Sequence, residues 1–210
     1  YEAEGPFVTN IENINLQGTG LIPVTALDMD PMSGVDFRQS ITIGNNQQVI
    51  LTVQWDDPFF ASVDTDLDFY LVDATTNTVV QRATSDNLAT DRPVEIIFFT
   101  NTTGAARTYE IVLDLVAGPA PGRVKWVNYG ANSFGPLAFI EHDTNSPTVI
   151  PHSTAPGALS VGAVSYFNQD STQSYTSLGP ATILFSPNGT PITPAVRAKP
   201  DVVSIDGTNN

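Results

Sequence analysis

Short apolar runs separated by polar turn clusters fill roughly the first 130 residues of the chain. The runs are QSITI, VILTVQW, LDFYLVD, TVVQRAT, VEIIFFT and YEIVLDLVA. They are rich in β-branched and aromatic residues, and many alternate between apolar and polar positions, as half-buried strands do. Turn-forming residues gather between them, as in GNNQQ and NTTGAA. No stretch before Gly130 has a helical period, so the pattern predicts an antiparallel β-sandwich.

The pattern changes after Gly130, where apolar residues become small and Pro and Gly are frequent. The run ALSVGAV, residues 158–164, is uniformly apolar. Such a run is typical of a strand that is covered on both faces in an α/β sheet. Helices and further strands that would cover it are missing from the pattern. We therefore expect this segment to be part of a domain, with apolar faces that could pair in a homodimer.

Composition excludes several classes of protein. The chain has 22 Asp and Glu against 8 Lys and Arg, a formal net charge of −14. A surface this acidic repels phosphate backbones, which argues against nucleic acid as a partner. No apolar run approaches the roughly 20 residues that cross a bilayer, so no membrane span is expected. The absence of cysteine excludes disulfides and thiol catalysis.

Three segments near the end of the chain form an ordered set. They read APGALSVGAV, YTSLGP and KPDVVSIDG, and the parts that carry the pattern are Pro156–Val164, Tyr175–Pro180 and Lys199–Gly207. Together they resemble the late part of the catalytic domain of subtilisin-like serine peptidases (subtilases). In that family a P-x-x-[IL]-x-V-G-A-[VT] strand leads to F-S-S-x-G-P and then to K-P-D-[VI]-x-A-P-G. The resemblance covers roughly the last 60 residues and implies a secreted or extracellular peptidase that acts on polypeptide substrates.

An earlier part of the chain also resembles a known module. W-x-x-P at Trp55–Pro58, DLDFYL at Asp66–Leu71 and TYEIV at Thr108–Val112 resemble the bacterial pre-peptidase C-terminal domain, a small jelly-roll β-sandwich attached to secreted peptidases. That module usually follows the whole catalytic domain, whereas here it precedes the late subtilase segments. The simplest interpretation is a sandwich inserted within a subtilase catalytic domain.

The expected organisation therefore has three parts. Residues 1–14 are a catalytic-domain remnant or linker, residues 15–130 are the inserted sandwich, and residues 131–210 are the late catalytic segment. The expected fold class is mainly β, a jelly-roll-like antiparallel β-sandwich followed by an incomplete subtilisin-like α/β segment.

The family's order of catalytic residues bears on activity. Subtilase triads run Asp, His, oxyanion-hole Asn and then Ser in G-T-S-M-A-x-P-H, and the late segments lie between that Asn and that Ser. The chain contains no G-T-S-x-A, H-G-T or D-[ST]-G. The resemblance thus implies that Tyr1 lies shortly after the oxyanion asparagine, and that the nucleophile lies beyond Asn210. No catalytic residue is expected in this chain, and the chain alone is expected to be inactive.

The adjacent pair His152–Ser153 raises another interpretation, that of a local base and nucleophile. A serine nucleophile needs an imidazole that reaches its hydroxyl and a third group that orients the base. Neighbours on an extended chain point to opposite sides, and Ser153 has no G-x-S-x-G elbow. The resemblance instead suggests a wall of the pocket that receives the substrate side chain, with an ordinary loop histidine as the alternative. The residues of this wall are Val149, Ile150, Pro151 and His152.

Three aspartates alternate along one predicted strand. Asp64, Asp66 and Asp68 would share one face of it, with Leu67, Phe69 and Leu71 on the other. Hard carboxylates suit Ca²⁺, which takes about six to eight oxygen ligands. The spacing lacks the Gly and terminal Glu of an EF-hand loop. A calcium site and a polar outer face whose carboxylates cap turns both remain open, and the expected function requires no cofactor.

Two charged clusters are expected to be structural. His142 lies between Glu141 and Asp143, and one histidine with flanking acids is a poor metal-ligand set, so a solvated loop is expected. Arg197 and Lys199 flank a bend before Pro200, near Asp201 and Asp206, which favours local ion pairing.

Two further patterns have a simpler explanation. A set of aromatic residues could form a sugar-stacking platform, but aromatics at strand spacing are more typical of a core. The set is Trp55, Phe59, Phe60, Phe69, Tyr70, Phe98, Phe99 and Trp126. Asn101 and Asn188 begin glycosylation acceptor patterns, which carry no weight in a presumed bacterial protein.

The leading interpretation is thus a segment of a secreted subtilisin-like serine endopeptidase that contributes substrate-pocket walls and an accessory sandwich. The alternative is a non-enzymatic extracellular β-sandwich module that binds calcium, polysaccharide or protein. A G-T-S-x-A motif soon after Asn210 in the coding sequence would distinguish the two.

Overall fold

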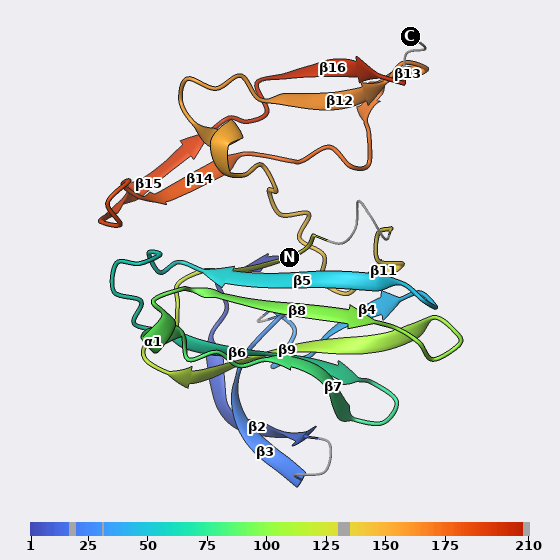
Figure 1. Cartoon of the computed structure of the whole chain (residues 1–210), viewed down its shortest axis with the longest axis vertical. Coiled ribbons are helices and arrows are strands. Elements are labelled where there is room, and N and C mark those ends of the chain that lie inside the picture. Colours follow the sequence, from blue (N-terminus) through green and yellow to red (C-terminus); the bar gives the residue numbers. More distant parts are fainter. Residues whose placement is uncertain (17–19, 31, 130–134, 208–210) are drawn as a thin grey trace. The chain divides into compact units, whose positions relative to one another are not determined.

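The computed structural model describes residues 1–16, 20–30, 32–129 and 135–207. Strands make up 48% of it and helices 4%, so the fold is mainly β, as the hydrophobic pattern predicts. The chain forms two compact units, Tyr1–Thr144 and Asn145–Asn210 (Figure 1). Within the part of the chain that is described, no helix has the length and apolar character needed to cross a membrane.

Four strands form the first sheet of the first unit, in the order β1–β10–β5–β8, and every neighbouring pair is antiparallel. They are β1 (Glu2–Ala3), β5 (Gln48–Trp55), β8 (Val94–Thr100) and β10 (Val124–Asn128). Burial alternates along β5, where Val49, Leu51 and Val53 are fully buried and their neighbours are not. This is the period of two that a strand with one core-facing side must show.

The second sheet is built around the long strand β9. One edge of β9 pairs with β4 and, further along, with β3, and the other edge pairs with β6. The sheet continues from β6 to β7, from β3 to β2 and from β4 to β11. The strands are β2 (Phe7–Leu16), β3 (Gly20–Leu27), β4 (Gln39–Ile43), β6 (Asp66–Asp73), β7 (Thr78–Ala83), β9 (Arg107–Ala117) and β11 (Phe139–Ile140).

The main core lies between these two sheets. Leu67, Phe69 and Leu71 of β6 are completely buried in it, on the face that their alternation predicts. Trp55 and Trp126 also belong to this core, as expected, whereas Phe59, Phe60 and Phe98 of the same aromatic set are exposed and do not. Burying one large apolar side chain contributes about 1.5–3 kcal/mol, so this layer is the main source of the unit's stability.

A second, smaller core covers the opposite face of β6 and β9. Tyr70, Val72 and Val112 on that face pack with Val24 and Ala26 of the β2–β3 hairpin, which is blue in Figure 1. The outer face of β6 is therefore apolar over much of its length and covered. The polar outer face that was one interpretation of the alternating aspartates is confined to the start of the strand.

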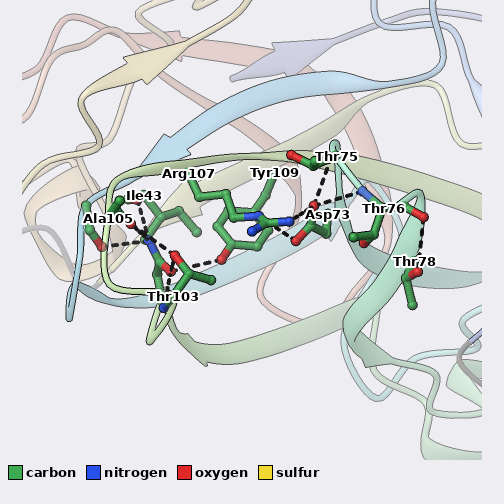
Figure 2. A network of polar contacts seen from close by, with 11 residues as sticks. Ile43, Asp73, Thr75, Thr76, Thr78, Thr103, Ala105, Arg107 and Tyr109 are labelled. Atoms are coloured by element: carbon green, nitrogen blue, oxygen red, sulfur yellow. Dashed lines mark hydrogen bonds and ion pairs between the residues drawn. The ribbon is translucent and has the colours of Figure 1, made fainter.

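Asn101 organises the turn that joins β8 to β9. Its side chain is completely buried, and its Oδ1 accepts hydrogen bonds from the Thr103 hydroxyl at 2.7 Å and the Tyr109 hydroxyl at 3.1 Å (Figure 2). Its Nδ2 donates to the backbone carbonyls of Ile43, Gly44 and Ala105. A buried amide whose donors and acceptor are all used rigidifies the turn.

An ion pair links β9 to the end of β6 in the same region. The guanidinium of Arg107 contacts the carboxylate of Asp73 through Nε at 2.6 Å and Nη2 at 2.9 Å (Figure 2). The backbone amides of Thr75 and Thr76 donate to the same carboxylate. Burial alone would raise the pKa of Asp73, but the hydrogen bonds from Arg107 and the two amides outweigh it and lower that pKa.

The second unit combines a three-stranded sheet with a separate hairpin. In the sheet, β12 pairs antiparallel with β13 and parallel with β16. In the hairpin, β14 pairs with β15. The strands are β12 (Val161–Ser165), β13 (Asn168–Thr172), β14 (Ala181–Phe185), β15 (Pro191–Arg197) and β16 (Val202–Asp206). Among the described residues, the short helices are α1 (Asn87–Thr90) in the first unit and the 3₁₀ turn η1 (Pro151–Thr154) in the second.

The sandwich unit extends past the limits expected from the sequence. At the start, β1 and β2 lie within residues 1–16 and pair with strands of its two sheets. At the end, β11 pairs with β4, and the unit closes at Thr144. The expected boundary between residues 130 and 131 falls in the segment 130–134, outside the described residues.

Candidate functional site

The first and third of the subtilase-like segments are joined by a buried lysine. The side chain of Lys199 is buried, and its Nζ donates to the Ala158 carbonyl oxygen at 2.6 Å and to Asp201 Oδ2 at 2.7 Å. The same Asp201 oxygen accepts the backbone amide of Ser160 at 2.7 Å. The hydrogen bond from Lys199 lowers the pKa of Asp201. Of the expected local ion pairing, the Lys199–Asp201 pair forms, and it holds the start of β16 against the residues that precede β12. Arg197 instead donates to the Thr154 carbonyl oxygen, and Asp206 accepts the Tyr175 hydroxyl.

The middle segment, YTSLGP, contacts both of the others. The Thr176 hydroxyl donates to the Ala163 carbonyl oxygen at 2.9 Å and accepts from the Ala163 amide at 3.1 Å, which anchors it to β12. Gly179 lies against the backbone of Lys199, where a Cβ atom would clash with the Lys199 carbonyl oxygen. Only glycine fits such a close approach of two backbones. The three segments therefore interlock through side chains and backbone that belong to the motifs themselves.

The predicted pocket wall is hydrogen-bonded to the middle segment, YTSLGP. The backbone amides of Thr148 and Val149 donate to the Leu178 carbonyl oxygen at 2.9 and 3.3 Å. Val149 is buried, whereas Ile150 is 52% exposed and His152 is also exposed. The side chain of Pro151 lies outside the described residues. The structure thus places an exposed turn with one apolar and one imidazole side chain beside the middle motif segment.

Ser153 uses its hydroxyl within this turn. Residues Pro151–Thr154 form the 3₁₀ turn η1, so His152 and Ser153 are not on an extended chain as the sequence argument assumed. Proline at the first position favours such a turn because its φ is already fixed near the helical value. The Ser153 hydroxyl donates to the Ile150 carbonyl oxygen at 2.8 Å. That bond occupies the hydroxyl proton, and a base contact of the kind a nucleophile needs is not formed here.

Two of the three aspartates considered for calcium have separate partners. Asp66 is buried and accepts the Asn87 backbone amide at 3.0 Å, whereas Asp68 accepts the Tyr70 hydroxyl at 2.7 Å. Asp64 is exposed and precedes β6. Within the described residues, these carboxylates do not form a group of three ligand atoms that lie within 4.8 Å of one another.

Such a group does form around His142. One ligand atom each from Asp36, Glu141 and His142 lie within 4.8 Å of one another. His142 Nε2 is 3.1 Å from Asp36 Oδ2, and its Nδ1 is 3.9 Å from Asp30 Oδ2. The second carboxylate oxygen of Glu141 accepts the Ser40 amide at 2.8 Å. Sequence reasoning missed this cluster, because Asp30 and Asp36 lie in the loop after β3, far from His142 along the chain.

A short contact between His142 and Asp36 is the main interaction within this cluster. It attaches the segment after β11 to the loop after β3. The neighbourhood is strongly acidic: burial together with Asp28, Asp30 and Asp36 raises the pKa of Tyr1 to about 12. The mixed imidazole and carboxylate donors differ from the all-oxygen set that Ca²⁺ prefers.

Comparisons of the chain with protein-family models, with curated proteins and with solved structures found no match. Function is therefore inferred from the residues and contacts described above.

Proposed function

We propose that this chain is a segment of a secreted subtilisin-like serine endopeptidase that acts on polypeptides. In this proposal the first unit is an accessory β-sandwich, and residues 145–210 contribute strands and part of the substrate-pocket wall to the catalytic domain. The observation that carries the proposal is the convergence of the three subtilase-like segments. Lys199, Thr176 and Gly179 each belong to one of those segments, and each contacts another of them.

The parallel pairing of β12 and β16 supports the same proposal. Val161 is in register with Val202, and Gly162 with Val203. Parallel strands occur almost only in sheets that are covered on both faces. Here Val161, Val202 and Val203 are each about half exposed, at 53%, 47% and 52%. Such apolar faces suit a sheet that continues into further elements of a larger domain, or that pairs with a second copy of this chain.

The proposed reaction is serine acylation followed by deacylation, carried out by a triad that this chain does not supply. The nucleophile would lie in a G-T-S-x-A motif after Asn210, and the segment Val149–His152 would line the pocket for a substrate side chain. Ser153 has no part in the chemistry, because its hydroxyl donates to the Ile150 carbonyl oxygen. The purified chain should therefore hydrolyse no peptide.

A substitution in the natural full-length protein tests the proposal. Lys199→Met removes both bonds of the buried ammonium, and the displaced pocket wall should lower the rate of casein hydrolysis by at least about tenfold. Lys125→Met is the matched control, since Lys125 pairs with Glu2 in the sandwich. It should leave hydrolysis unchanged. Equal activity of the two variants, or no peptidase activity in the natural protein, would contradict the proposal.

The alternative, a non-enzymatic extracellular module that binds calcium, polysaccharide or protein, has one observation in its favour. This is the Asp36–Glu141–His142 group, which could offer three ligand atoms to a cation. Thermal melting with and without Zn²⁺, which accepts imidazole and carboxylate ligands together, tests this group. A rise in Tm that His142→Ala abolishes would support a cation-binding module, and an unchanged Tm would count against one at this group.

A further inference from the structure

The cationic side chains of this acidic protein are almost all engaged. Six of the 8 Lys and Arg residues bind a carboxylate or a backbone carbonyl through their charged groups. They are Arg38, Arg107, Arg123, Lys125, Arg197 and Lys199. Within the described part of the chain, the guanidinium groups of Arg82 and Arg92 have neither an ion pair nor a hydrogen bond. Arg82 acts on Asp68 only through space.

These two arginines line the same pocket. It has a volume of about 380 Å³ and lies where the end of β7, the short helix α1 and the start of β8 meet. The hydroxyl-bearing residues Ser85 and Thr90 also contribute to its lining. This volume is within the range of about 300–1,000 Å³ that is usual for small-ligand sites.

The Arg92 guanidinium is positioned by an aromatic ring and not by an ion pair. Its guanidinium carbon lies 5.3 Å from the centre of the Phe60 ring, a cation–π contact. The Phe60 backbone amide donates to the Asp91 carbonyl oxygen at 2.9 Å, which fixes the ring's loop beside Arg92. An aromatic face leaves the N–H donors at the guanidinium edge available for an oxyanion.

One acid also lines the pocket, and its oxygens are already used. Glu95 is 2% exposed, and its Oε1 accepts the Ser85 amide at 2.9 Å and the Asn87 side-chain amide at 3.1 Å. Its Oε2 accepts the Ser85 hydroxyl at 3.4 Å. With two arginines and one glutamate, the formal charge of the lining is 2 − 1 = +1, in a chain whose net charge is −14.

We propose that this pocket binds a carboxylate group of an acidic ligand through the guanidinium groups of Arg82 and Arg92. A single carboxylate carries the one negative charge that the lining lacks, and guanidinium–carboxylate pairs form two parallel N–H···O bonds. A doubly charged phosphate would leave an excess negative charge beside Glu95. The inference is independent of the proposed peptidase function, because every residue of the pocket lies in the sandwich unit.

Side-chain NMR of the arginine Nε–Hε groups tests the proposal directly on the whole chain. The acidic probes are trigalacturonate and an acetylated tri-aspartyl amide, and their neutral counterparts are maltotriose and the tri-asparaginyl amide. At least one acidic probe should shift the Arg82 and Arg92 signals saturably, and neither neutral counterpart should. Whichever acidic probe binds identifies whether the carboxylate comes from a sugar acid or from a peptide.

Three variants make the result specific. Arg82→Gln and Arg92→Gln should each weaken binding by about tenfold, as expected for loss of a charge-assisted hydrogen bond. Arg123→Gln, at a residue paired with Glu4, should leave binding unchanged. Absence of a saturable shift with both acidic probes would overturn the proposal. So would equal weakening by Arg123→Gln, or tighter binding of inorganic phosphate than of either carboxylate probe.

Discussion

Asp68 and Asp114 lie directly opposite each other on the paired strands β6 and β9. The Tyr70 hydroxyl donates to Asp68 at 2.7 Å, and the Thr25 amide donates to Asp114 at 2.6 Å. Burial raises the pKa of Asp114 to about 6. The nearby charge of Asp68 raises this pKa further, whereas the hydrogen bond from Thr25 lowers it. Burial also raises the pKa of Asp68. Burial thus makes both carboxyl groups harder to ionise than they are in water.

This pair should make the sandwich less stable as pH rises. Asp114 has a pKa of about 6 in the folded state against 3.8 as its ordinary value, so its neutral form favours folding. The stability it contributes is present below about pH 4 and is lost as pH rises through about 6. The free energy of unfolding of Asp114→Asn should therefore match that of the wild type at pH 4 and exceed it by about 2 kcal/mol at pH 8. Urea unfolding followed by the fluorescence of Trp55 and Trp126, both in the sandwich core, measures this.

Asp73→Asn is the control of opposite sign. The hydrogen bonds to Asp73 lower its pKa despite burial, so the stability it contributes is present above its unfolded pKa and is lost as pH falls. This variant should be less stable than the wild type at pH 8. If Asp114→Asn also lost stability at pH 8, the buried pair would not be a source of strain.

Asn101→Ala should be among the most destabilising substitutions in the sandwich. It removes the donor for three backbone carbonyls and the acceptor for Tyr109, which should lower the free energy of unfolding by about 3 kcal/mol. Asn188→Ala, at an exposed position in the second unit, should leave the tryptophan-monitored transition unchanged.

In a glycosylating host, mass spectrometry of the folded protein should find Asn101 unmodified, because its amide is buried. Modification at Asn101 without loss of stability would contradict the network in Figure 2.

Gly179→Ala should loosen the second unit. The added Cβ would clash with the Lys199 carbonyl oxygen, so the middle and last motif segments would have to separate. Hydrogen exchange read by mass spectrometry should show faster exchange in β12 and β16. Gly157→Ala is the matched control, because no atom lies within 4 Å of a Cβ at that position. Equal protection in the two variants would show that the close approach is not needed.

Self-association should depend on the exposed face of the parallel pair. Val161 and Val202 are in register on that face, so the double substitution to Glu places two charges on it. Sedimentation velocity should show a concentration-dependent dimer for the wild type and a monomer for the double variant. Val35→Glu, at a 52% exposed position in the sandwich unit, should keep the dimer. A wild type that stays monomeric at every concentration would refute the homodimer.

Local patterns in the sequence were sufficient for much of the sandwich. The alternation of Leu67, Phe69 and Leu71 indicates the core face of β6 correctly, because side-chain direction in a strand depends only on position. The pattern could not show that the β2–β3 hairpin covers the other face. Coverage depends on contacts between segments that are distant along the chain, and periodicity carries no information about them.

The candidate sites likewise combine local contacts, which the sequence predicts, with contacts that depend on the fold. The Lys199–Asp201 pair is local and was predictable, whereas the contacts of His142 with Asp30 and Asp36 depend on the fold. The pocket lined by Arg82 and Arg92 was not predicted from the sequence either. Nothing along the chain shows that the guanidinium groups of these two arginines, unlike the other Lys and Arg side chains, form neither an ion pair nor a hydrogen bond within the described residues.

Labelling of the natural full-length protein with a fluorophosphonate, followed by peptide mapping, tests the central claim most directly. The proposal predicts one modified serine, within a G-T-S-x-A sequence that follows Asn210, and no label on the isolated chain Tyr1–Asn210. A label on Ser153, or a full-length protein that takes up no label at any serine, would contradict the assignment of this chain to a serine peptidase.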